Sequence, residues 1–166
     1  ELRCTDMKGV LCVGGFHRVI GLAERNVSIT DENFKAWRMH CANGLLEDAF
    51  DAGYTEAATA NGLEEYVDSL AQSFTLHPAG SNPQFDLDFI GRLCPNLPLH
   101  YHRIDMATIR DSLEAAGWDV KPEGETPITS AHRTSTCLDR DIHQYARLIR
   151  GLSEYPVRYI ATKEAR

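Results

Sequence analysis

Strand-type segments come first in this chain, and helix-type and strand-type segments alternate after them. Glycine and β-branched residues dominate the first thirty residues, which predicts two or three short strands with Gly14-Gly15 as a candidate hairpin turn. The residues that carry this prediction are Val10, Val13, Gly14, Gly15, Val19, Ile20, Val27 and Ile29. This order of elements predicts an α/β fold.

Apolar residues at helical spacing, and residues that begin or end helices, define the later elements. We expect helices at 43–52 with Gly53 as C-cap, at 62–73, at Phe85–Leu93 before Pro95, from the cap residue Asp105 to Gly117, and around Leu138, Ile142, Tyr145 and Ile149 up to Gly151. We expect strands at Phe74–Leu76 and Leu99–Ile104, a turn at Pro78-Ala79-Gly80 and a loop at Asp119–Ser130. With no repeat, low-complexity tract or charge block, we interpret residues 1–166 as one domain.

Charge and cysteine content narrow the function classes. The formal net charge is −7, so counterion release cannot drive wide, non-specific duplex binding, and any bound nucleic acid should be short or held through metal ions or a local basic patch. No run of eighteen apolar residues occurs, which excludes a transmembrane span.

The five cysteines, at 4, 12, 41, 94 and 137, contain no pair with a two-residue gap. We therefore expect reduced thiols in an intracellular compartment, with Cys41 and Cys94 as small core residues.

Three segments carry candidate chemistry: 4–9 (CTDMKG), 80–90 (GSNPQFDLDFI) and 131–138 (AHRTSTCL). Together with 43–46 (NGLL) and 99–106 (LHYHRIDM), in this order and spacing, they make the sequence resemble the DEDDh 3′→5′ exonucleases, and within them the oligoribonucleases. The resemblance covers most of the chain. It implies a ribonuclease H-like exonuclease fold, with a central mixed β-sheet flanked by helices.

In that family four acidic side chains hold two divalent metal ions, and a histidine serves as general base. Hard cations require carboxylate oxygens, and a histidine can take a proton from water near neutral pH. The resemblance places Asp86 on the family's middle aspartate, His132 on the catalytic histidine and Asp6 on a glutamate position. Cys4 and Cys137 stand where the family has its first and last aspartates.

Several interpretations of these positions remain open. A four-residue shift, about one helical turn, would let Asp141 replace Cys137, but the gapless alignment keeps the apolar face of the last helix toward the core. An active enzyme would then bind Mg²⁺ or Mn²⁺ through Asp6, Asp86 and Asp141, whereas a thiol is a poor Mg²⁺ ligand. Cys4, Cys137, His132 and an aspartate from 6 or 86 could instead bind Zn²⁺, Cys4 and Cys137 could form a disulfide, or both thiols could stay unpaired.

Each acidic or basic residue also has a simpler interpretation. Asp86 could cap the helix that it begins, His132 could be a hydrogen-bonded structural residue, and Asp6 could be a solvated loop residue.

The resemblance also implies substrate-binding positions. Val10 stands in place of a leucine that wedges between bases, Trp37 is a possible counterpart of a stacking aromatic, and Tyr101 matches a tyrosine supplied by the partner subunit. Trp37 and Tyr101 could instead pack in the core or at a dimer interface.

Two hypotheses of function follow. The first is an oligoribonuclease-like fold with a degraded two-metal site, a catalytically impaired subunit that needs no cofactor and has a binding or structural role with RNA or a ribonucleoprotein assembly. The second is a metal-dependent 3′→5′ exoribonuclease on short RNA that uses Asp6, Asp86, Asp141 and His132. The family's homodimer is possible in both, and neither involves a membrane.

Overall fold

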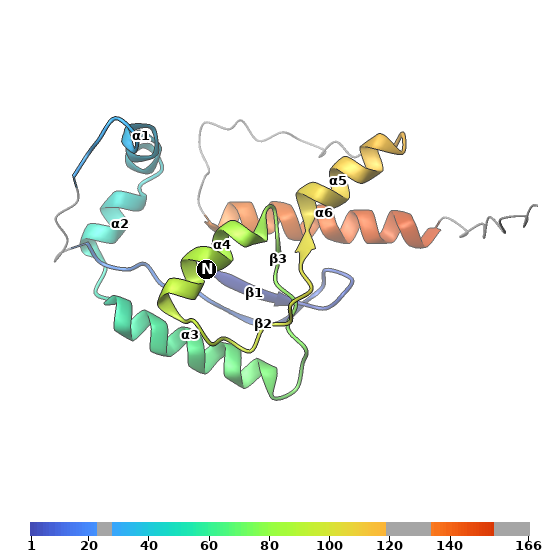
Figure 1. Cartoon of the computed structure of the whole chain (residues 1–166), viewed down its shortest axis with the longest axis horizontal. Coiled ribbons are helices and arrows are strands. Elements are labelled where there is room, and N and C mark those ends of the chain that lie inside the picture. The colour runs from blue at the N-terminus through green and yellow to red at the C-terminus, as the bar shows by residue number, and fades with distance from the viewer. Residues whose placement is uncertain (23–27, 119–133, 155–166) are drawn as a thin grey trace, which may run out of the picture.

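The computed structural model describes residues 1–22, 28–118 and 134–154, which form a mixed α/β structure (Figure 1). The elements in chain order are β1 (Leu2–Thr5), β2 (Leu11–Phe16), α1 (Phe34–Ala42), α2 (Leu45–Asp51), α3 (Glu56–Ala71), β3 (Ala79–Gly80), α4 (Pro83–Leu93), β4 (Ile104–Asp105), α5 (Met106–Ala115) and α6 (Thr134–Glu154). In the part of the chain that the structure describes, no helix is both long and apolar enough to cross a bilayer.

β1 and β2 form an antiparallel hairpin whose turn lies at residues 6–10. Asp6 closes this turn, because its carbonyl accepts from the N–H of Gly9 (3.0 Å) and its carboxylate accepts from the N–H groups of Lys8 (2.8 Å) and Val10 (2.9 Å). Gly9 has φ +80°, a left-handed conformation that favours glycine. The hairpin turn is therefore built from Asp6 and Gly9.

The prediction of a turn at Gly14-Gly15 is wrong, because both glycines lie within β2. The register passes from Leu2 opposite Phe16 to Cys4 opposite Val13, so two residues of β1 face three of β2. A Cβ on Gly15 would lie 2.7 Å from the carbonyl oxygen of Leu2. Gly15 thus permits a close approach of the strands beside this irregularity, and the glycine pair does not form a turn.

β3 and β4 pair in parallel, and Leu76 forms a parallel bridge with Leu99. The expected turn at Pro78-Ala79-Gly80 is wrong, since Ala79 and Gly80 lie opposite Ile104 and Asp105. The strands expected at Phe74–Leu76 and Leu99–Ile104 are reduced to that bridge and to the short strand β4.

The predicted helices are present with shifted bounds. α3 begins at Glu56 because Thr55 caps it, its hydroxyl accepting from the N–H of Ala58 at 3.1 Å. The α2 C-cap is the extended residue Ala52, so Gly53 does not fill that role. α6 runs through Gly151 to Glu154, and α1 was not predicted. The loop predicted at Asp119–Ser130 lies outside the described residues.

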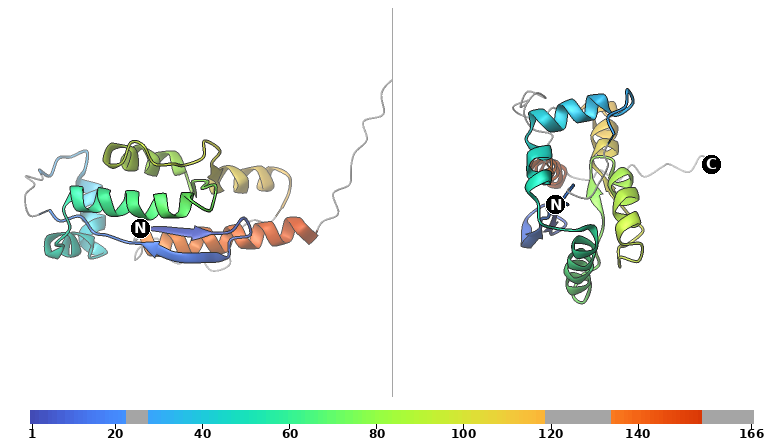
Figure 2. Two further views of the ribbon diagram at one scale, coloured as in Figure 1. Left: turned by 90° about the horizontal axis from the view of Figure 1, so that it is seen from below. Right: turned by 90° about the vertical axis from the view of Figure 1, so that its left-hand side faces the viewer.

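Two clusters of buried side chains hold these elements together. In the first, Leu63 and Val67 of α3 meet Cys94 against half-buried residues of the hairpin and α4. In the second, Met106 of α5 packs against Leu148 of α6. The hairpin lies between α3 and α6 (Figure 2). Cys94 is 2% exposed, as expected of a core residue, whereas the same prediction for Cys41 is wrong because that thiol is exposed on α1.

Candidate functional site

The carboxyl ends of β3 and β4 meet at the start of α4 and α5, the edge at which parallel sheets commonly hold sites. Two consecutive backbone N–H groups after β3 donate to two carboxylates from distant parts of the chain. The N–H of Ser81 donates to Oδ2 of Asp141 at 3.0 Å, and that of Asn82 donates to Oδ1 of Asp105 at 3.2 Å. Asn82 has φ +60°, a left-handed conformation that asparagine tolerates better than most residues.

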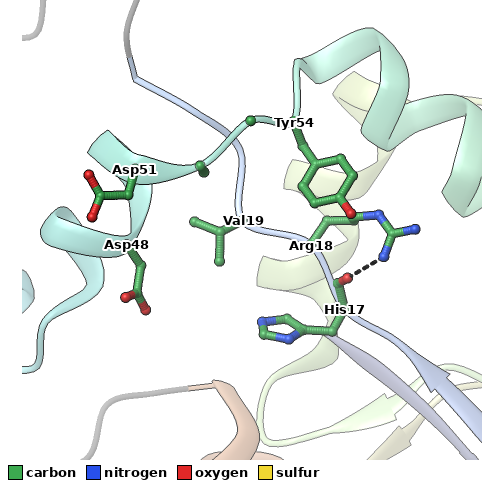
Figure 3. A pocket seen from close by; sticks show the side chains of 8 residues that line it. His17, Arg18, Val19, Asp48, Asp51 and Tyr54 are labelled. Atoms are coloured by element: carbon green, nitrogen blue, oxygen red, sulfur yellow. Dashed lines mark hydrogen bonds between the residues drawn. The ribbon is translucent and has the colours of Figure 1, made fainter.

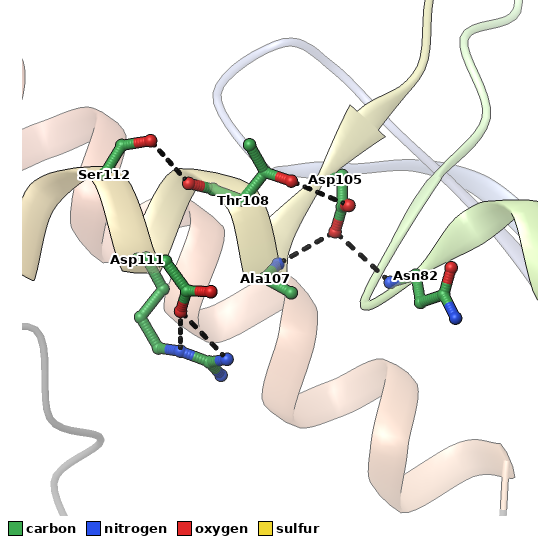
Figure 4. A network of polar contacts seen from close by, with 7 residues as sticks. Asn82, Asp105, Ala107, Thr108, Asp111 and Ser112 are labelled. Atoms are coloured by element: carbon green, nitrogen blue, oxygen red, sulfur yellow. Dashed lines mark hydrogen bonds and ion pairs between the residues drawn. The ribbon is translucent and has the colours of Figure 1, made fainter.

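Asp105 has a structural role in this region (Figure 4). Its carboxylate also accepts from the N–H of Ala107 and the hydroxyl of Thr108, both at 2.9 Å, and so caps α5 as predicted. These bonds lower the pKa of Asp105, the Thr108 hydroxyl most strongly. Asp105 therefore joins the beginnings of α4 and α5 and has little remaining capacity to bind a ligand.

Asp141 projects from α6 toward the same edge. Its side chain is only 13% exposed. Oδ1 accepts from Nη2 and Nε of Arg140 at 2.8 and 3.0 Å, while Oδ2 accepts from Ser81. Both carboxylate oxygens thus already have partners within the protein.

Asp86 lies in the first turn of α4, and Asn82, not Asp86, is the N-cap of that helix. The pKa of Asp86 is raised, first by burial and further by the negative charge of Asp141, with the amino group of Glu1 acting in the opposite direction. Asp86 and Asp141 are therefore electrostatic neighbours. The structure brings together these two predicted acids from α4 and α6.

Asp6 lies elsewhere, in the hairpin turn. The N–H groups of Val10 and Lys8 lower its pKa, and it is exposed. Its negative charge acts on Tyr145, which follows Asp141 by one turn of α6, and whose raised pKa comes first from burial and then from Asp6. The expectation that Asp6 is a solvated loop residue agrees with this placement, and its carboxylate serves the turn.

The two cysteines that replace acidic residues lie on different elements. Cys4 of β1 is half-buried, and burial raises its pKa, with a smaller effect from Cys12. Cys137 lies one turn before Asp141 on α6. Both are thiols, so no disulfide joins these two described residues. His132 lies outside the described residues.

The acids that the resemblance assigns to the metal site lie on three different elements: Asp86 on α4, Asp141 on α6 and Asp6 in the hairpin turn. Such a site needs several carboxylates around two cations, whereas the fold gathers Asp86 with Asp141 and leaves Asp6 on its own turn. Within residues 1–22, 28–118 and 134–154, no group of three or more histidine, cysteine, aspartate or glutamate side chains is arranged to hold a metal ion.

The three predicted substrate-binding residues lie in separate parts of the fold. Val10 is 60% exposed in the hairpin turn, Trp37 is half-buried on α1, and Tyr101 is 77% exposed. The Tyr101 ring contacts those of His100 and His102, with centroids 4.5 and 4.1 Å away. α1 and the hairpin turn lie toward opposite ends of the molecule, so the fold does not bring Val10 and Trp37 together (Figure 1).

A pocket of about 410 Å³ lies at the junction of β2 and α2, which the sequence did not predict. Val19 separates Asp48 and Asp51 of α2 from Arg18 and Tyr54, and the Arg18 guanidinium carbon lies 4.5 Å from the Tyr54 ring centroid (Figure 3). Because Asp48 and Asp51 are three residues apart, the sequence alone places them on one face of a helix. Only the fold places that face beside residues 17–19.

Compared with known proteins, the chain matches no family model and no curated protein.

Proposed function

We propose that this chain is an oligoribonuclease-like member of the DEDDh exonuclease family, with a ribonuclease H-like fold, that has lost metal-dependent catalysis. It works as a binding or structural subunit with RNA, in a ribonucleoprotein assembly. The family assignment rests on the ordered motifs at 4–9, 43–46, 80–90, 99–106 and 131–138. The mixed α/β structure is compatible with the α/β class to which that fold belongs.

The observation that best supports the loss of catalysis is the hydrogen bonding of the Asp141 carboxylate. Both of its oxygens accept hydrogen bonds from the protein, from Arg140 and from the N–H of Ser81. These donors compete with a metal ion for the Asp141 carboxylate, and the positive charge of Arg140 opposes a cation beside it. At the N-terminal strand, Cys4 offers a protonated thiol in place of a carboxylate, because burial raises its pKa.

A second candidate function is an active 3′→5′ exoribonuclease. It is favoured by the position of Asp141, which lies one turn after Cys137 on the same face of α6 and acts electrostatically on Asp86. In that case Asp141, one helical turn after Cys137, would supply the family's last acidic ligand, and Asp86 would remain its acidic partner.

The experiment that separates the two is degradation of an end-labelled five-nucleotide RNA with Mg²⁺ or Mn²⁺, at high protein concentration. Asp86→Ala removes the acid of the candidate site. Asp88→Ala is its matched control, since Asp88 lies on the same helix, is exposed, and bonds the side chain of Gln84. We expect no shortening by any of the three proteins.

Stepwise shortening from the 3′ end, lost in Asp86→Ala and kept in Asp88→Ala, would overturn this proposal and establish the exonuclease. Fluorescence anisotropy with the same RNA, and sequencing of RNA that co-purifies with the chain, measure the binding role directly.

A further inference from the structure

The hairpin places two cysteines on neighbouring strands at an irregularity in the ladder. Cys4 lies opposite Val13, and the next residue, Thr5, lies opposite Leu11. One step along β1 therefore matches two steps along β2, and Cys12 is the additional residue. In such a bulge, two residues of one strand oppose a single residue of the other. Cys12 therefore lies in β2 directly beside Val13, the residue opposite Cys4.

This arrangement fits the dimensions of a disulfide. Opposed residues of an antiparallel pair have Cα atoms about 4.5–5.5 Å apart. A disulfide spans Cα atoms about 4.4–6.8 Å apart. Cys12 is the neighbour in sequence of the residue in that opposed position, so a small local movement of the bulge would bring it into this range. Burial raises the pKa of Cys4, and the charge of Cys12 raises it further, so the two thiols act on each other electrostatically.

The two thiols differ in access. Cys12 is exposed and its Sγ lies 3.4 Å from the carbonyl oxygen of Val10, to which it can donate, whereas Cys4 is half-buried. A reagent in solution therefore meets Cys12 first, and Cys4 lies behind it as the second thiol.

We propose that Cys4 and Cys12 form a dithiol modification site, which low-molecular-weight disulfides oxidise to a disulfide across the hairpin. The thiolate of Cys12 attacks one sulfur of the reagent, forming a mixed disulfide and releasing one reagent thiolate. The thiolate of Cys4 then attacks Sγ of Cys12 and releases the second reagent thiolate. Each cysteine loses its proton to solvent, and the reagent is reduced as the pair is oxidised. The step requires neither metal nor RNA and is independent of the proposed function.

The product has a structural consequence at the turn that carries Asp6. A Cys4–Cys12 bond closes a short ring around residues 6–10, whose Met7 carbonyl accepts from the Tyr145 hydroxyl at 3.1 Å. Oxidation therefore fixes the part of the hairpin that contacts α6.

The test is incubation of the fully reduced chain with oxidised glutathione, followed by acid quenching, trypsin digestion and mass spectrometry. We expect an intact mass lower by about 2 Da, the two hydrogens lost on forming one disulfide. The diagnostic product joins the peptides 4–8 and 9–18. Cys12→Ser should abolish it, whereas the matched control Cys41→Ser, which removes another exposed thiol, should retain it.

Two results would overturn the proposal. One is a linkage of Cys4 to Cys137; the other is glutathione that stays on Cys12 while Cys4 remains reduced. Because Cys12→Ser could unfold the hairpin, the wild-type chain is also oxidised in concentrated urea. If the fold selects the Cys4–Cys12 disulfide, it must be the main product without urea, and several different cysteine pairings must form in urea. The same distribution of pairings in both conditions would count against the proposal.

Discussion

Among single residues, Asp86 is a carboxyl group whose ionised form the fold disfavours. Burial and the charge of Asp141 raise its pKa, so the folded protein holds this proton to higher pH than the unfolded chain does. Stability from this group therefore falls as pH rises from the ordinary aspartate pKa through the raised value. We expect Asp86→Asn to stabilise the protein at pH 7 by less than about 1 kcal/mol, since the group is largely exposed and screened.

Thermal unfolding of the wild type and Asp86→Asn between pH 3 and 7 measures this effect. The gain should shrink as pH falls, because the wild-type carboxyl group becomes neutral too. A gain that is constant across this range would mean that the substitution acts through packing and not through charge.

Asp6 should show the opposite pH dependence. The N–H groups of Val10 and Lys8 lower its pKa, so its contribution is present above the ordinary aspartate pKa and is lost as pH falls through the lowered value. Asp6→Ala removes the acceptor and should lower the melting temperature at pH 7, whereas Asp6→Asn keeps an acceptor oxygen and should lower it less. Thermal unfolding at pH 7 and pH 3 tests this, and equal melting temperatures for both variants at pH 7 would contradict the turn role.

At the scale of elements, two helix caps differ in how much structure they join. Thr55 caps α3 alone, whereas Asp105 caps α5 and also accepts from the N–H of Asn82 at the start of α4. An N-cap replaced by alanine costs about 0.5–2 kcal/mol. We expect Asp105→Ala to lower the free energy of unfolding by an amount near the upper end of this range, and Thr55→Ala by an amount near its lower end. Urea titration of both variants measures these free energies. The reverse order would show that the link to α4 adds no stability.

Elements determined by nearby residues could be predicted from the sequence, and those determined by distant ones could not. Asp105 and the apolar spacing of Met106, Ile109 and Leu113 are local signals, and α5 follows them. Gly14-Gly15 has the same local composition whether it forms a turn or lies within a strand, and the choice depends on Leu2 of the opposite strand. β3 is only two residues long and exists because β4 pairs with it.

The candidate site follows the same division. The sequence singled out Asp86 and Asp141, but only the packing of α6 against the β3–α4 junction makes them neighbours. The pocket beside Tyr54 was not predicted because its walls come from the segment after β2 and from α2 with the residues that follow it, which share no motif.

At the scale of the whole molecule, α6 connects the parts that the chain order separates. Its Asp139 pairs with Arg3 of β1, its Tyr145 bonds the hairpin turn, and its Leu148 packs on Met106 of α5. Gly9 of the hairpin turn lies close to α6, because an added Cβ would lie 3.0 Å from Cβ of Ala146 and 3.2 Å from its backbone. The docking of α6 therefore depends on a residue without a side chain.

Gly9→Ala tests this docking, with Gly44→Ala as its control. Both glycines have φ in the left-handed region, +80° and +74°, but a Cβ on Gly44 meets nothing within 4 Å. Gly44→Ala should cost about 1–2 kcal/mol for backbone strain alone. Gly9→Ala should cost about 1–3 kcal/mol more, because it also forces α6 away from the hairpin. Free energies of unfolding from urea titration give both values, and equal costs would mean that α6 does not rest on the turn.

Ala146→Gly in the Gly9→Ala background should recover part of the additional loss of stability, since it removes the Cβ that the new methyl group meets. The size of that recovery in a double-mutant cycle measures the contact between the hairpin and α6.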